Sequence, residues 1–327
     1  MMAPFMTEAV VALSDVTKRF AGHVAVRGLS LSVPRGVLYG LLGPNGAGKT
    51  TTIRMINDIV KPDAGTITLF GALPPGRAAQ RRIGYLPEER GLYPRMTVRR
   101  VLSFLAELRG LGRAEVAPKI TRWLDRLELG RWADAKVETL SKGMQQKVQF
   151  IATVLHEPDL LILDEPFSGL DPLNADVLRD IVREQKKAGK TILFSTHLME
   201  HAEQLCDALC IMARAQRVLE GSLADVKLHA RDARNAYRVE IARKTGEPPA
   251  ALSMRPGVAV SRAPGNGGAY DVELPPGESA SDLLRRLVDS GEEIVHFERS
   301  VPTLHQIFVD QVRRHDESAA AGGAAHA

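Results

Sequence analysis

The sequence predicts an α/β fold, in which buried strands alternate with helices, followed by a smaller α+β domain. Three observations lead to this prediction. A continuously apolar strand at 37–42 runs into a glycine-rich loop and then into a helical pattern. A second apolar strand at 160–163 ends at an Asp-Glu pair, and a third at 191–195 follows a helix. Beyond about residue 225, apolar and polar residues alternate instead, which is typical of strands buried on one face only.

The other elements of the larger domain, expected over residues 7–224, follow from the same patterns. A loosely alternating strand at 7–20 precedes a turn at Ala21-Gly22-His23. From 95 to 157 the apolar residues fall on one face of a helical pattern. The remaining expected elements are a strand at 29–33, short strands with turns over 63–86, and a helix at 177–187.

The smaller α+β domain is expected over residues 225–315, with the element order β, β, α, β, α of a ferredoxin-like fold. The tail at 316–327 is rich in Ala and Gly and is expected to be disordered. The elements of this domain are strands at 237–241 and 270–274, a helix at 281–288, a strand at 294–299 and a helix at 303–313.

Composition and charge narrow the function classes. The 327 residues carry a formal net charge of +4, and basic and acidic residues are interleaved along the chain. Because no dense basic block stands out, no nucleic-acid partner is expected. No stretch reaches the roughly 18 consecutive apolar residues that a spanning helix needs, and the first residues lack the pattern of a secretory signal. If the protein acts in transport, we therefore expect the pore to come from another chain.

The two cysteines, Cys206 and Cys210, lie four residues apart in a helix-like stretch that also holds His197 and His201. Two cysteines provide no disulfide framework, which suits the reducing cytoplasm. Four such side chains are also able to ligate a metal ion. Small apolar thiols on a helix usually belong to the core, however, and the core interpretation is favoured.

The glycine-rich loop has the Walker A pattern of two glycines five residues apart followed by Lys and Thr. Its glycines let backbone N–H groups surround phosphate oxygens, and the following helix adds its positive N-terminal end. Lys49 is expected to reach the β- and γ-phosphates, and the Thr50 hydroxyl to ligate Mg²⁺. The residues predicted to bind the nucleotide here are Gly43, Pro44, Asn45, Gly46, Ala47, Gly48, Lys49, Thr50 and Thr51.

The Asp-Glu pair after the second buried strand has the Walker B pattern. Asp164 ends an apolar strand, where a charge needs a partner, and Mg²⁺ supplies one. Glu165 follows directly and is positioned to act as general base on the attacking water. Alone, such a pair is often a solvated strand end, but beside a phosphate loop it predicts a catalytic site.

At this point the sequence resembles the ABC (ATP-binding cassette) ATPase family over residues 7–222, about two thirds of the chain. Each further motif has an ordinary structural alternative when taken alone, and only their joint order is specific. The motifs are a signature motif at Leu140-Ser141-Lys142-Gly143-Met144-Gln145, a D-loop at Ser168-Gly169-Leu170-Asp171, a switch histidine at His197, an adenine-stacking aromatic at Phe20, and a Q-loop region at Ile83-Gly84-Tyr85-Leu86-Pro87-Glu88.

The resemblance implies a P-loop NTPase of ABC type with a helical subdomain at about 90–157. It also implies a homodimer that sandwiches ATP and Mg²⁺ between two cassettes. Ser141 and Gly143 of one copy would contact the γ-phosphate held by Lys49 of the other, aided by a helix that begins near Ser141. Glu165 would act as base while His197 holds the γ-phosphate, and the open–close cycle would drive an integral membrane permease. The expected location is the cytoplasm, at the inner face of the cell membrane.

Two departures from the family pattern affect the site. The Q-loop glutamine is replaced by Glu88, with Glu89 as an alternative register, and a carboxylate donates no hydrogen bond. The signature motif contains Lys142 and Met144 in place of the usual residues. Both departures resemble ATPase subunits of two-component exporters that carry an added C-terminal domain.

Other functions stay open at this stage. A ribosome-associated or DNA-repair ABC ATPase is less favoured, because the chain has one Walker A motif and no sustained heptads. A binding module with weak hydrolysis is disfavoured by Glu165. Tyr93, Pro94 and Met96, on the Q-loop side of the helical subdomain, are candidates for lining a groove where a permease docks.

Overall fold

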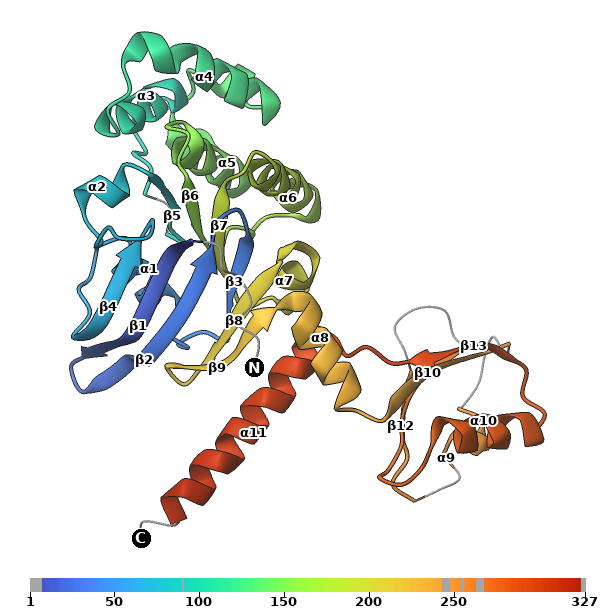
Figure 1. Ribbon diagram of the computed structural model, residues 1–327. Coiled ribbons are helices and arrows are strands. Elements are labelled where there is room, and N and C mark those ends of the chain that lie inside the picture. The colour runs from blue at the N-terminus through green and yellow to red at the C-terminus, as the bar shows by residue number, and fades with distance from the viewer. Residues whose placement is uncertain (1–7, 90, 243–247, 254–255, 263–267, 325–327) are drawn as a thin grey trace. The chain divides into compact units, whose positions relative to one another are not determined.

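The computed structural model describes residues 8–89, 91–242, 248–253, 256–262 and 268–324. The chain divides into two compact units (Figure 1). One consists of Met1–Leu223 together with Gln311–Ala327, and the other is Ala224–Asp310. Each unit has its own sheet structure and is described by itself.

The first unit is built around a six-stranded sheet that carries buried, continuously apolar strands. All neighbours pair in parallel except the last two, which are antiparallel. Strands buried on both faces are expected in a parallel sheet. In sheet order they are β5 (Ile83–Leu86), β6 (Leu160–Asp164), β7 (Thr191–Thr196), β3 (Leu38–Leu42), β8 (Ala208–Ala213) and β9 (Gln216–Ser222). The predicted α/β fold is confirmed.

A second, antiparallel sheet has the order β2-β1-β4, formed by β2 (His23–Pro34), β1 (Ala9–Phe20) and β4 (Ala64–Leu69). The main core combines apolar residues of both sheets, such as Val11 and Ile162, with Ile53 and Met55 of helix α1 (Lys49–Ile56). Figure 1 shows α1 next to both sheets. Helix α1, which follows the glycine loop, is therefore held in place by packing against both sheets.

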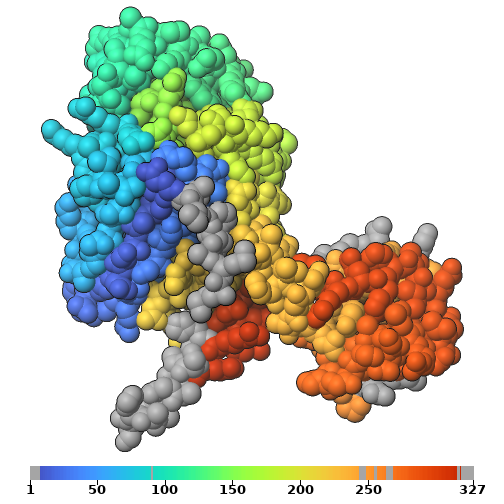
Figure 2. Space-filling view, in the orientation of Figure 1, coloured from blue at the N-terminus to red at the C-terminus, as the bar shows by residue number. Residues whose placement is uncertain are grey.

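The helices of residues 98–187 gather at one end of the first unit (Figure 1), which is teal to yellow-green in Figure 2. Two 3₁₀ turns, Gly130–Trp132 and Val137–Thr139, interrupt the long helical pattern. A short helix, α2, lies within the segment where only strands were predicted. The helices are α2 (Arg77–Gln80), α3 (Val98–Leu108), α4 (Arg113–Arg126), α5 (Lys142–Val154), α6 (Pro172–Lys187) and α7 (Met199–Leu205).

The prediction of a helix-like stretch around both cysteines is wrong. Cys206 ends α7, and Cys210 lies in the middle of β8, where all six residues are buried. A short apolar run reads the same in a buried strand as in a buried helix, so its periodicity does not distinguish the two. The interpretation of both thiols as core residues agrees with their burial.

The second unit has a four-stranded antiparallel sheet of order β11-β12-β10-β13. The elements follow one another as β, α, β, β, α, β, which is the ferredoxin-like arrangement. Helix α9 and strand β11 were not predicted. The elements are β10 (Ala236–Ile241), α9 (Ala250–Ser253), β11 (Ala259–Arg262), β12 (Ala269–Glu273), α10 (Ala280–Asp289) and β13 (Ile294–Arg299). Val239, Val272, Leu283 and Leu287 form the centre of their core.

Two helices flank this sheet in the sequence, α8 (Leu223–Asp232) and α11 (Leu304–Ala324). The predicted disordered tail at 316–327 is wrong as far as residue 324, because α11 continues to Ala324. Alanine has the highest helix propensity, so an alanine-rich segment extends a helix that is already started. Residues 325–327 lie outside the described part of the chain.

Candidate active site

The loop between β3 and α1 depends on two glycines that no other residue would replace without strain. Gly43 has φ 147° and Gly48 has φ 104°, both in a region that favours glycine. A Cβ atom on Gly43 would lie 2.1 Å from the Met212 carbonyl oxygen, and one on Gly48 would lie 2.4 Å from that of Ala25. The loop therefore packs directly against the backbone of β8 and β2.

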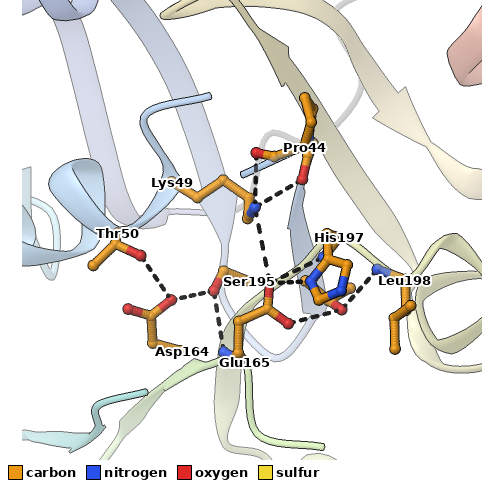
Figure 3. A network of polar contacts seen from close by, with 10 residues as sticks. Pro44, Lys49, Thr50, Asp164, Glu165, Ser195, His197 and Leu198 are labelled. Carbon is orange, nitrogen blue, oxygen red and sulfur yellow. Dashed lines mark hydrogen bonds and ion pairs between the residues drawn. The ribbon is translucent and has the colours of Figure 1, made fainter. Parts of the chain in front are cut away.

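Lys49, the first residue of α1, lies at the centre of the site and is only 6% exposed. Its Nζ donates to the carbonyl oxygens of Gly43 (2.7 Å) and Pro44 (3.2 Å) and lies 3.8 Å from Glu165 Oε1 (Figure 3). Burial lowers the pKa of Lys49, and the neighbouring carboxylates oppose this effect. An anionic group of a ligand would stabilise the charged amine further.

Asp164 ends β6 and is fully buried. Its Oδ1 accepts hydrogen bonds from the Ser195 hydroxyl and from Thr50 Oγ1 at 3.4 Å. Its Oδ2 accepts none from the described residues. Burial raises the pKa of Asp164. A buried carboxylate with an unused oxygen beside a hydroxyl provides the oxygen ligands that Mg²⁺ prefers, so the residues fit this ion.

Glu165 is held in place by the end of β7. Its φ of 49° is strained for a residue with a side chain, which is common at functional sites. Its Oε1 accepts from the His197 backbone N–H (3.0 Å) and lies 2.9 Å from His197 Nδ1, and its Oε2 accepts from Thr196 Oγ1 at 3.3 Å (Figure 3). The side chain is thereby fixed next to Lys49.

A cavity of about 380 Å³ contains most of the predicted nucleotide-binding residues. Phe20, at the end of β1, and Glu88, just after β5, lie on its wall together with the glycine loop. Gly43 and Pro44 contribute through their carbonyl bonds to Lys49. The lining consists of Phe20, His23, Ala25, Asn45, Gly46, Ala47, Gly48, Lys49, Thr50, Thr51, Glu88 and Glu165.

Ser141, Gly143 and Asp171 are not among the described residues that line this cavity. Ser141 caps the N-terminus of α5, where its side chain accepts from the Met144 N–H, so the helix predicted to begin near Ser141 is present. Asp171 caps α6 by accepting from the Asn174 N–H at 3.0 Å. Asn174 is also one of the side chains next to Gly143, so the signature motif and the D-loop are neighbours.

Four residues of the site were missed by sequence reasoning. Ser195 and Thr196 bind the two acidic side chains, and His23 lines the cavity. Gln149 of α5 donates to the carbonyl oxygens of Pro87 and Glu89, on both sides of Glu88. The two hydroxyls at the end of a buried strand were a usable signal, because neighbouring parallel strands end at the same edge of the sheet. Gln149 carries no comparable signal.

The helical end of the first unit has two further cavities. One of about 830 Å³ is lined by three arginines, Arg77, Arg81 and Arg109, together with exposed Ile59 and Leu108. The second, of about 300 Å³, shares Tyr85, Leu108 and Arg109 with it. Neither lining includes the residues proposed for permease docking, Tyr93, Pro94 and Met96.

Two further findings concern a metal ion and a membrane-spanning helix. Within the described residues, His, Cys, Asp and Glu side chains form no group of three that would hold a metal ion, so the cysteine–histidine site has no structural support. The structure also contains, in its described part, no helix long and apolar enough to cross a bilayer.

Comparisons with known proteins agree along both units. A family model described as ABC transporter matches residues 26–168, and one described as ATP-binding protein DrrA1-3-like, C-terminal domain, matches residues 221–312. The uncharacterized ABC transporter ATP-binding protein YhaQ of Bacillus subtilis is 40% identical over 93% of this chain and 98% of its own. The Nod factor export ATP-binding protein I of Burkholderia orbicola is 41% identical over 66% of this chain and 72% of its own.

Solved structures of ABC transporter subunits have a similar fold over about two thirds of this chain. An ATP-binding subunit of an ABC transporter matches with a TM-score of 0.62 at 33% identity, over 68% of this chain and 93% of that one. CbiO1 from Clostridium perfringens, part of the ABC transporter complex cbiONQ, matches with a TM-score of 0.60 at 26% identity, over 68% and 92%.

Proposed function

The chain belongs to the ABC transporter ATP-binding proteins, and from this membership we propose how its residues bind ATP, hydrolyse it and act on a membrane partner. Its function is that of the ATP-binding and ATP-hydrolysing subunit, which powers transport through a separate permease. The relative named for Nod factor export supports export as the direction.

The observation that carries the residue assignments is a pair of contacts beside the cavity: Lys49 lies 3.8 Å from Glu165, and the Thr50 hydroxyl lies 3.4 Å from Asp164. We assign the triphosphate to the glycine loop, with Lys49 at the β- and γ-phosphates. The adenine would stack on Phe20, whose ring is 45% exposed and lies on the same cavity wall.

Thr50 and Asp164 would hold Mg²⁺, supported by the unused Oδ2 and by the hydroxyl 3.4 Å from Oδ1. When bound, the ion would neutralise charge that develops on the phosphate oxygens. Glu88 is close enough to the loop to assist, because both line the cavity. A carboxylate there accepts hydrogen bonds from water but donates none, in contrast to the glutamine it replaces.

Hydrolysis needs a base for the attacking water, and Glu165 is assigned this role. The proton of the water would pass to its carboxylate as the oxygen attacks the γ-phosphorus, and the bond from that phosphorus to the bridging oxygen would break to release ADP. His197 Nδ1 contacts Glu165 Oε1 at 2.9 Å, which leaves Nε2 for the γ-phosphate.

We propose that a second copy of the chain completes the site. Ser141 is exposed at the N-terminus of α5, a position suited to a phosphate on another molecule. Leu173 and Leu198, just after the D-loop aspartate and the switch histidine, are 79% and 43% exposed. Exposed apolar side chains beside both motifs are consistent with a face that is covered in a dimer.

We propose that the permease contacts the arginine-lined cavity near α2 and α3, with Ile59 and Leu108 as apolar contacts. Tyr93, 47% exposed, remains a candidate for the edge of that contact. Binding a permease would place the chain at the cytoplasmic face of the membrane.

The test is Glu165→Gln, which keeps the size of the side chain and removes the base. We expect turnover to fall about 10²- to 10⁴-fold, the usual contribution of general base catalysis, and an ATP-bound dimer to persist in gel filtration. Glu200→Gln, on the exposed side of α7, is the matched control and should hydrolyse normally. A Glu165→Gln chain that stays monomeric with ATP would contradict the proposed dimer.

A further inference from the structure

Phe20, the last residue of β1, carries a cation over its ring. The Lys18 ammonium lies 5.3 Å from the ring centroid. Only 14% of the Lys18 side chain is exposed, which is unusual for a lysine, whereas Phe20 is 45% exposed. The lysine is therefore held in place beside a ring that is nearly half exposed.

Asp63, just before β4, holds this lysine. Its Oδ1 accepts from Lys18 Nζ at 2.8 Å, and its Oδ2 accepts from the Arg19 N–H at 2.6 Å. Its own backbone N–H donates to the Thr17 carbonyl oxygen at 2.8 Å. The hydrogen bond from Lys18, followed by the one from Arg19, lowers the pKa of Asp63, so the carboxylate is charged at neutral pH. One residue thus binds three consecutive residues of β1 directly before Phe20.

A tight turn fixes the backbone on the other side of Phe20. Strands β1 and β2 are joined by Ala21 and Gly22, whose φ values of 37° and 84° are both positive. Two positive values are typical of the type I′ turn, which matches the twist of a hairpin. Phe20 and His23 flank the turn as a cross-strand pair. The backbone of Phe20 is therefore held on both sides.

We propose that Lys18 and Asp63 are positioning residues for the nucleotide base. Phe20 lines the cavity of about 380 Å³, whereas Lys18 and Asp63 do not. Asp63 keeps the Lys18 ammonium on the ring face away from the cavity, and the opposite face of Phe20 is left for a purine. The inference rests on the proposed function, because it assumes that adenine stacks on Phe20.

The charge on one face of the ring strengthens stacking on the other. An aromatic ring has a negative potential on both faces, so two rings stacked face to face partly repel each other. A cation is attracted to one face and draws π-electron density toward itself. The opposite face then becomes less negative and repels a purine less. A ring that is already held in place also loses less conformational freedom when the base binds.

The first test compares ATP with tripolyphosphate, which has a chain of three phosphates and no base, each with Mg²⁺. We expect Lys18→Met to weaken ATP binding about two- to fivefold, the range of a cation–π contact at an exposed site. The affinity for tripolyphosphate should not change, because the lysine acts on the base alone. Isothermal titration calorimetry measures both affinities. Equal losses for the two ligands, or no loss for ATP, would overturn the proposal.

Two further variants distinguish positioning from a structural role of the lysine. Lys18→Arg keeps a cation over the ring and should retain the ATP affinity. In a Phe20→Leu background, Lys18→Met should cause no further loss, because the lysine acts through the ring. In turnover assays the loss should appear in KM for ATP and not in kcat, since the base binds equally in the ground state and the transition state. Additive losses in the Phe20→Leu background, or an equal loss in Lys18→Arg, would refute the role of Lys18.

Asp63 is tested in the same way. Asp63→Ala releases the ammonium, and we expect the ATP affinity to fall about twofold while the tripolyphosphate affinity stays the same. Once Asp63 is replaced, Lys18→Met should cost less ATP affinity than it does in the natural chain, because the two residues act together. An undiminished cost would show that the ammonium keeps its place without the carboxylate, and would contradict the role of Asp63.

Arg35→Met is the matched control. Arg35 forms an ion pair with Glu8 at the opposite end of the β1–β2 hairpin, and neither residue lines the cavity. Loss of this pair should leave the ATP affinity unchanged, and a loss equal to that of Lys18→Met would count against the proposal. If the proposed function itself is wrong, the natural chain binds neither ATP nor tripolyphosphate. If only this inference is wrong, ATP binds and Lys18→Met has no base-specific effect, so the two failures are distinguishable.

Discussion

Charged residues at the candidate site of the first unit and a charged pair in the second unit are shifted in opposite directions. In the first unit, burial moves the pKa of Lys49 down and that of Asp164 up, so both are shifted toward the neutral form. In the second unit, hydrogen bonds from Arg238 to Asp271 at 3.0 and 3.2 Å raise the pKa of the guanidinium, toward the charged form. The fold leaves the charges of Lys49 and Asp164 poorly compensated, whereas Arg238 and Asp271 compensate each other.

This difference distinguishes residues that serve to bind a ligand from residues that stabilise the fold. A charge that is shifted toward neutrality lowers the stability of the free protein and has to be useful in another state. Lys49 lines the cavity assigned to ATP, and Asp164 lies 3.4 Å from the Thr50 hydroxyl on its wall, so ATP with Mg²⁺ would compensate both. Arg238 and Asp271 lie on neighbouring strands and contribute to a small sheet that needs no ligand.

The largest expected effect concerns Lys49. We expect Lys49→Ala to weaken ATP binding on the order of a hundredfold or more, because a buried charge pair with phosphate is lost. Isothermal titration calorimetry measures the change. Lys61→Ala, with a side chain 74% exposed, is the control and should bind ATP normally. Unchanged affinity in Lys49→Ala would show that the glycine loop does not hold the triphosphate.

The next effect concerns Asp164 and has an unusual sign. Because its folded pKa lies above its unfolded value, stability falls as pH rises through the unfolded value toward the folded one, and stays lower at neutral pH. Asp164→Asn removes that charge, so we expect the free protein at pH 7 to gain about 1–3 kcal/mol in free energy of unfolding. Turnover should be lost in the same variant. Urea unfolding without nucleotide measures the gain, and a lower midpoint would contradict the comparison.

The smallest effect lies in the second unit. Arg238→Gln breaks the pair with Asp271, and we expect a loss of about 0.5–1 kcal/mol, since the pair is only partly buried. ATP affinity should not change. Arg285→Gln, whose side chain is 73% exposed, is the control and should have no measurable effect on unfolding. A gain in stability for Arg238→Gln would contradict the comparison, because Asp164→Asn in the first unit is also expected to gain stability.

Much of the first unit follows from local patterns in the sequence. The strand, glycine loop and helix at 37–56 and the strand that ends at Asp164 are specified by continuous apolar runs followed by charge. The structure brings the glycine loop, Phe20, Glu88 and Glu165 to one cavity, while their chemical roles remain predictions. The elements that were missed are short: α2, α9 and β11 have four residues each, too few to show a period.

Residues that act through long-range contacts were not predictable from one sequence. Gln149 and Pro87 are 62 positions apart, and only the packing of α5 beside β5 brings them together. Ser195 and Asp164 are 31 positions apart, on neighbouring strands. The alanine-rich end of α11 failed for a different reason, because composition was weighed above helix propensity.

The close packing around Gly48 would link the two ends of a nucleotide that binds as proposed. The hairpin of β1 and β2 carries Phe20, and Ala25 of the same hairpin presses against the glycine backbone of the loop. If the base stacks on Phe20 and the phosphates bind the loop, as proposed, this main-chain contact sets the distance between them, whatever the side-chain rotamers. A larger residue at position 48 would therefore shift the proposed positions of the base and of the phosphates at the same time.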